Sequence, residues 1–295
     1  GCNWTALAGS EYCLQDVTRQ CLVTPLLLAL ADTVDLAYRG REPGMDQLWE
    51  RYCHHLGQSV DTLKRGKDWH MVHHARNCAE IVLNLFMHGP VERGLDVAAG
   101  GVDIYNLAAD GLGLATVADS LAAVEQRLCV EKRLTWTELA ALLARNWEGA
   151  EDVRLMMKAG PRYGAGGSRA DLWALRVCER YSDLVRGTPT PDGFRILPGL
   201  FSHGGVAGWG RGLAATPNGR RAGDPISHSA DPDPGFLPDG SGAPTAKSTA
   251  VAVTQPHWGN ATPLQLDLDR GLACSIGGID CVIALLEAHN ELGGS

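Results

Sequence analysis

Residues 215–227 read ATPNGRRAGDPIS, and this short string contains two glycines, two prolines and two adjacent arginines. The Asn-Gly pair at 218–219 is typical of a tight turn, because both residue types tolerate a left-handed backbone. Either Arg220 or Arg221 is placed to pair with Asp224 on the far side of that turn. The composition of the string therefore predicts a structured polar loop, and it gives neither arginine a catalytic role.

Strand-like segments lie on both sides of this loop. The segments FRILPGLFSHGG (194–205), STAVAVTQP (248–256) and TPLQLDLD (262–269) read as strands separated by loops rich in glycine and proline. An amphipathic helix is expected in IDCVIALLEAHNELGG (279–294), which ends at glycine. We therefore expect residues 188–295 to contain mainly strands and Gly/Pro-rich loops.

The preceding residues, 1–187, are predicted to be mainly helical. Apolar residues recur with the 3.6-residue period of a helix through residues 11–90, and a break or kink is expected at Pro25. The glycine-rich segment at 96–120 predicts a buried strand or a tight loop, followed by a helix at 114–132. Two capping-box pairs predict further helix starts: Thr135 with Glu138, and Ser168 with Asp171. Helices followed by strands favour one α/β or α+β body.

The composition argues against several classes of protein. The 295 residues carry a formal net charge of −8 and contain no basic run, so nucleic acid is not an expected partner. No stretch approaches the ~18 consecutive apolar residues of a membrane-spanning helix, and no signal peptide is visible. The nine cysteines form no C-x-x-C pair, so reduced thiols in a cytoplasmic protein are expected.

Several ordinary kinds of site compete for the unusual polar residues. His70, His74 and Cys78 repeat at four-residue intervals beside His73, a spacing that could hold zinc, although solvated surface histidines are the default interpretation. The glycine-rich segments GGVAGWGRG and SGAPTAKST lack the P-loop spacing, and DPDPGFLPDG lacks the closing glutamate of a calcium loop. Cys2 has no protease-like signature around it. No metal site is therefore assigned.

The string at 215–227 resembles a long and unusual motif of the glycyl radical enzymes, the superfamily of pyruvate formate-lyase and glycerol dehydratase. Further matches follow in the order found in that superfamily and span nearly the whole chain. They are GCNW (1–4), GLDVAAGGVDIYN (94–106), GLATVADSLAA (113–123), TWTELAALLARNWEGAEDVR (135–154) and PRYG (161–164). The first of them resembles the cysteine loop of these enzymes.

The resemblance implies a fold and an assembly. The expected fold is α/β, with residues 1–295 forming half of a ten-stranded barrel surrounded by helices. The radical glycine lies in a motif that this chain does not contain, so the resemblance implies the C-terminal half of such a barrel, inactive as an isolated fragment. A homodimer is implied as well.

The resemblance also implies a chemistry. Cys2 would carry a catalytic thiyl radical, generated by a glycyl radical that a separate iron–sulfur activating enzyme installs with S-adenosylmethionine. Arg19 roughly matches an arginine that binds the carboxylate of pyruvate, and Trp4 replaces a glutamate found in the dehydratases. Both are assigned to substrate binding, with no other bound cofactor. Loss of the glutamate removes its proton transfer, which argues against a diol dehydratase.

Two functions therefore stand as expectations. The first is a fragment of a formate C-acetyltransferase-like enzyme, an acyltransferase or lyase that cleaves a C–C or C–heteroatom bond of a small anionic substrate. The second is a non-catalytic homologue or half-barrel that serves as a scaffold or as a binding partner of the activating enzyme.

Overall fold

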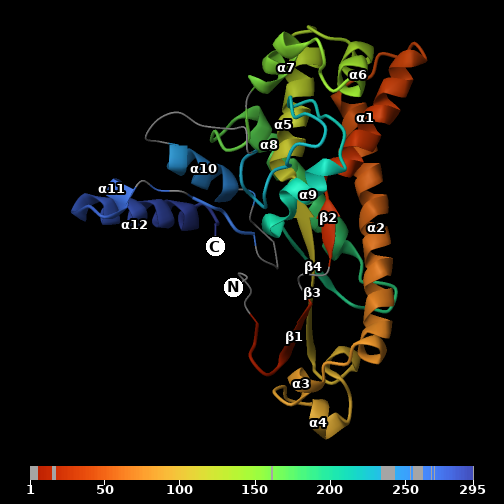
Figure 1. Ribbon diagram of the computed structural model, residues 1–295, viewed down its shortest axis with the longest axis vertical. Helices are drawn as coiled ribbons and strands as arrows, with labels where there is room; N and C mark the ends of the chain where they lie inside the picture. The colour runs from red at the N-terminus through yellow and green to blue at the C-terminus, as the bar shows by residue number, and fades with distance from the viewer. Residues whose placement is uncertain are drawn as a thin grey trace.

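A parallel sheet lies at the centre of the molecule (Figure 1). The structure, a computed structural model, describes residues 6–14, 18–160, 162–233, 243–252, 254, 262–266, 268 and 270–294. Within these residues the strands are β1 (Glu11–Leu14), β2 (Arg19–Cys21), β3 (Ile104–Leu112) and β4 (Ile196–Gly199). All pairings are with β3 and all are parallel.

The register places β3 in the middle of the sheet. Leu107 of β3 is opposite both Leu14 of β1 and Ile196 of β4. Asp110 of β3 is opposite both Arg19 of β2 and Gly199 of β4. β1 and β2 therefore follow one another along one edge of β3, and β4 lies along the other edge.

Part of the glycine-rich segment forms a buried strand, which is one of the two structures that the sequence allows. Residues from Asn106 to Leu112 of β3 are all buried, and the only carboxylate among them is Asp110. A Cβ added to Gly111 would lie 3.0 Å from Leu200 Cδ2 and 3.2 Å from Tyr181 Cε1, so a glycine allows the neighbouring elements to pack closely.

Helices surround the sheet (Figure 1). The longer ones are α1 (Val23–Tyr38), α2 (Met45–Asn77), α5 (Leu114–Val124), α8 (Arg169–Gly187) and α12 (Ile276–Glu291), and a π-helical segment, Glu125–Val130, continues α5. The shorter ones are α3 (Ile81–Asn84), α4 (Pro90–Arg93), α6 (Trp136–Ala144), α7 (Glu151–Lys158), α9 (Val206–Arg211), α10 (Ala243–Ala252) and α11 (Arg270–Ala273). Among the described residues, no helix combines the length and hydropathy of a membrane-spanning segment.

Both predicted capping boxes are confirmed. At the start of α6, Thr135 Oγ1 accepts the Glu138 amide at 3.2 Å, and Glu138 Oε2 accepts the Thr135 amide at 2.8 Å. Ser168 and Asp171 form the equivalent pair at the start of α8, with distances of 3.1 and 2.7 Å. These reciprocal bonds satisfy amides that have no partner within the first helical turn.

Several expected elements are wrong. Residues 11–14 and 19–21 form strands, so the helical pattern begins later than predicted. Pro25 does not kink α1, because it lies in the first turn, where its missing N–H would have no helical partner. In 194–205 only β4 is a strand.

Two of the expected strands are replaced by other structure. Residues 248–252 belong to the helix α10, and residues 262–266 and 268 are in no strand. The alternation of alanine with valine and threonine in this region suits either a strand or a helix, and tertiary context decides between them.

The loop at 215–227 is held mainly by main-chain carbonyl groups. The turn at Asn218-Gly219 is confirmed, with Gly219 at φ +84°. The guanidinium of Arg220 donates to the carbonyls of Ala214, Gly210 and Asp224 at 2.7, 3.1 and 3.1 Å. Arg221 instead pairs with Glu151 at 2.7 Å. The expected pairing of an arginine side chain with the Asp224 carboxylate is therefore wrong.

We predict that Gly210→Ala destabilises the fold strongly. A Cβ at this position of α9 would lie 2.1 Å from the carbonyl oxygen of Asp224, so the backbone of the loop would have to move. Overpacking of this kind costs about 2 kcal/mol or more of the free energy of unfolding, measured by urea denaturation. Gly208→Ala is the matched control in the same helix, because nothing lies within 4 Å of its added Cβ. Equal losses in the two variants would contradict the account.

Candidate functional site

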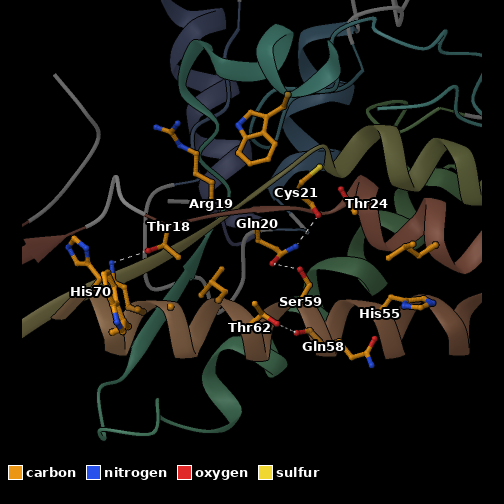
Figure 2. A pocket seen from close by; sticks show the side chains of 16 residues that line it. Thr18, Arg19, Gln20, Cys21, Thr24, His55, Gln58, Ser59, Thr62 and His70 are labelled. Atoms are coloured by element: carbon orange, nitrogen blue, oxygen red, sulfur yellow. Dashed lines mark hydrogen bonds between the residues drawn. The ribbon is translucent and has the colours of Figure 1, made fainter. Parts of the chain in front are cut away.

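A cavity of about 790 Å³ lies beside β2 (Figure 2). Its walls are β2 itself, the start of α1, the face of α2 between His55 and His70, and Trp209 of α9. Among the described residues that line it there is no aspartate or glutamate, whereas Arg19 and Lys67 are both present. A cavity with cationic and neutral walls attracts anions.

The side chains of β2 project in two directions. Gln20 points towards α2, where its Oε1 accepts a hydrogen bond from Ser59 Oγ at 2.9 Å. Its Nε2 donates to the carbonyl of Cys21 at 3.0 Å. Because side chains alternate along a strand, Arg19 and Cys21 point away from α2, as Figure 2 shows. The Gln20–Ser59 bond therefore fixes the direction in which Arg19 projects.

Arg19 is the permanent positive charge of the cavity. A guanidinium remains protonated at any pH at which proteins fold. The Nε atom of Arg19 is buried and has no hydrogen-bond partner, and the described residues provide no ion pair for this side chain. A buried donor without a partner costs about 1–3 kcal/mol, more when it is charged. An anion in the cavity would remove this cost.

Lys67 is a second cation, but its charge depends on pH. The residue is 3% exposed, and its Nζ donates to Thr18 Oγ1 at 3.0 Å. Burial lowers the pKa of Lys67 from 10.5 to about 8, although the carboxylate of Asp110 opposes this shift. Burial also lowers the pKa of His70, with further contributions from His74 and Lys67. Near neutral pH the cavity thus holds Arg19 and a lysine close to its titration point.

The three predicted site residues have different outcomes. Arg19 lines the cavity, as a substrate-binding residue would. Cys2 and Trp4 lie outside the residues that the structure describes, so their roles stay predictions. Sequence reasoning missed Lys67 and Trp209. The helical spacing of Ser59, Leu63, Lys67 and His70 on α2, at intervals of four, four and three residues, could have identified Lys67. Trp209 was hidden in a segment considered only as a phosphate loop.

The histidine-rich segment makes ordinary side-chain contacts. His74 Nε2 lies 3.0 Å from the Tyr12 hydroxyl and 3.2 Å from Glu80 Oε1. His73 contacts the carbonyl of Trp69 at 2.7 Å and stacks on the indole of that residue. Within the described part of the chain, no group of three or more His, Cys, Asp or Glu residues is arranged to hold a metal ion.

We predict that the free energy of unfolding rises with pH because of Lys67. Between the pKa of about 8 in the folded state and 10.5 in the unfolded state, only the unfolded chain holds this proton. Stability therefore increases with pH in that window, by about 2 kcal/mol between roughly pH 7.5 and 9.5. Urea denaturation should show wild type gaining this amount relative to Lys67→Met. A matched substitution of the exposed Lys132 should show no such trend, and a flat difference for Lys67→Met would contradict the assignment.

Comparison with known proteins places this site in a family. The pyruvate formate lyase-like family model matches residues 1–206. The (2S)-3-sulfopropanediol dehydratase of Klebsiella oxytoca is 26% identical over 200 residues, which cover 66% of this chain and 24% of that protein. The isethionate sulfite-lyase of Oleidesulfovibrio alaskensis is 36% identical over 124 residues, which cover 39% of this chain and 14% of that protein.

The fold comparison agrees with the family match. The glycerol-bound B12-independent glycerol dehydratase from Clostridium butyricum aligns with a TM-score of 0.87 at 20% identity, covering 97% of this chain and 37% of that one. The sequence matches reported above show that the chain spans a quarter or less of the length of those two curated relatives. The expected α/β fold is confirmed as part of a larger barrel surrounded by helices. The chain belongs to the pyruvate formate lyase-like family of the glycyl radical enzyme superfamily.

Proposed function

We propose that the protein is part of a glycyl radical lyase that cleaves a C–O or C–S bond in a small anionic substrate. The names of its relatives describe the removal of water or of sulfite. These names favour elimination over the acetyl transfer that the sequence also allowed. The observation that carries the proposal is the cavity beside β2, in which the Nε of Arg19 has no partner and no described lining residue is acidic.

Arg19 would bind the anionic group of the substrate. Guanidinium groups form short, charge-assisted and often bidentate hydrogen bonds with planar or tetrahedral oxyanions. Isethionate, 3-sulfopropanediol and trans-4-hydroxy-L-proline, the compounds in the names of the relatives, each carry a sulfonate or a carboxylate. An anion of this kind would supply the acceptor that the buried Nε of Arg19 lacks.

Cys2 would start the reaction. Its thiyl sulfur takes a hydrogen atom from a carbon of the substrate, so that a thiol forms and a carbon-centred radical remains. The bond from the neighbouring carbon to oxygen or sulfur then breaks, and the unpaired electron stays on one of the two fragments. That radical takes a hydrogen atom back from the Cys2 thiol, which restores the thiyl radical and leaves both products with paired electrons. An activating enzyme with an iron–sulfur cluster and S-adenosylmethionine would generate the glycyl radical from which the Cys2 radical derives. Cytoplasmic location and a homodimeric parent complete this proposal.

Trp4 affects which leaving group is favoured. An indole cannot donate and accept a proton as the glutamate of the dehydratases does. Hydroxide is a strongly basic leaving group and needs a proton as it departs, whereas sulfite leaves as a weakly basic anion. Replacement of the glutamate by Trp4 therefore favours C–S cleavage, unless another group protonates a departing hydroxyl.

Anaerobic activation of the full-length parent protein tests this function. Electron paramagnetic resonance should show a glycyl doublet, and the activated enzyme should consume isethionate or (2S)-3-sulfopropanediol but not the neutral compound glycerol. Absence of the doublet under conditions that activate a relative would favour the non-catalytic alternative. Turnover of glycerol at a rate equal to that of the anionic compounds would contradict the assignment of an anionic substrate.

We predict that Arg19→Gln lowers kcat/KM of the parent enzyme for its anionic substrate about 10- to 100-fold, because one charge-assisted contact is worth about 1.5–3 kcal/mol. Arg19→Lys should retain part of the activity, since it keeps the charge and loses the bidentate geometry. The matched control is Arg39→Gln, which changes an exposed arginine outside the cavity. Equal effects of the two glutamine variants would contradict the role of Arg19.

A further inference from the structure

The helix α9 is fixed in place by the loop at 215–227. The carbonyl of Gly210 accepts a hydrogen bond from Arg220 Nη2 at 3.1 Å, and the amide of Ile226 donates to the carbonyl of Val206 at 3.4 Å. Gly210 itself packs against Asp224, since its added Cβ would lie 2.1 Å from that carbonyl oxygen. The family motif therefore sets the position of α9 relative to the sheet.

Trp209 is the residue of α9 that lines the cavity. Its side chain is 38% exposed, and its ring lies over Gly205, where an added Cβ would be 3.5 Å from the indole Cδ1. Trp209 and Arg19 line the same cavity, yet the described structure gives no cation–π contact between them, although Arg176 makes such contacts with Trp49 and Trp173. Because both side chains line the cavity, a ligand bound there can contact the guanidinium and the indole.

We propose that Trp209 determines substrate specificity by forming an apolar wall of the pocket whose anion-binding group is Arg19. This inference rests on the proposed function, because it requires the anionic end of the substrate to bind Arg19. The carbon segment of the substrate then packs against the indole, which limits its length. The substrate class is a short-chain sulfonate or carboxylate.

Arg19 and Trp209, which form two walls of the cavity, contribute differently to substrate specificity. The guanidinium binds any small oxyanion, so it provides affinity without discrimination between carbon chains. The indole is a rigid ring, and the backbone of α9 that carries it is held by the Arg220–Gly210 hydrogen bond and by the close approach of Gly210 to Asp224. Discrimination among anions of different length would therefore depend on Trp209 and not on Arg19.

Binding of simple anions to this chain tests the inference. Isothermal titration calorimetry would use inorganic sulfite, ethane-1-sulfonate and pentane-1-sulfonate with wild type, Trp209→Ala, Trp209→Phe and Arg19→Gln. Wild type should bind ethane-1-sulfonate more tightly than pentane-1-sulfonate. Trp209→Ala should improve the affinity for pentane-1-sulfonate relative to ethane-1-sulfonate about tenfold, because removal of the indole admits the longer chain. Trp209→Phe should give a ratio of the affinities for pentane- and ethane-1-sulfonate between those of wild type and Trp209→Ala.

The remaining arms separate the two proposals. Sulfite has no carbon chain, so Trp209→Ala should change its affinity less than about twofold, whereas Arg19→Gln should weaken all three anions about tenfold or more. An unchanged ratio of pentane- to ethane-1-sulfonate in Trp209→Ala would overturn the role of Trp209 while leaving that of Arg19 intact. A parallel loss of sulfite would show a merely structural effect and would also overturn it. Failure of wild type to bind any of the anions would overturn the anionic-substrate assignment, and the role of Trp209 with it.

Discussion

A guanidinium group that lacks an anion is the constraint on which this site depends. The Nε of Arg19 is buried without an acceptor, and the described walls of its cavity contain no carboxylate. Arg19 as a whole is only partly buried, so the cost falls on its Nε, a buried donor without an acceptor. Arg19 therefore makes sense as half of an interaction whose other half is a bound anion, and the remaining features of the site serve to hold this group in place.

The fold positions the walls of the Arg19 cavity through two separate sets of contacts. On one side, the register of β2 with β3 and the bond between Gln20 and Ser59 fix the strand on which Arg19 lies. On the other side, the buried side chain of Arg220 binds three carbonyls and thereby sets the position of α9. The long motif at 215–227, which first suggested the resemblance to glycyl radical enzymes, is thus structural in this chain, and it acts on the cavity through the helix that it supports.

The sequence predicted some features well because their causes are local or because a long motif carries them. The capping boxes at Thr135 and Ser168 act over three residues, and the buried strand at 104–112 follows from its glycine-rich, apolar composition. The fold came from resemblance to a family, not from periodicity. β1 and β2 have four and three residues, which is too short to give a reliable alternation.

The site was harder to predict because its contacts join distant residues. Lys67 contacts Thr18 across 49 positions, and no local pattern reports such a contact.

The claim that Arg19 binds an anion is tested most directly by the Nε–H resonance of Arg19 in a ¹H–¹⁵N spectrum of this chain. The resonance is assigned by its loss in Arg19→Lys. Addition of isethionate should shift this resonance downfield in a saturable manner as the group gains an acceptor. A resonance that stays unchanged while isethionate binds elsewhere, or that shows no saturable change at all, would contradict the account.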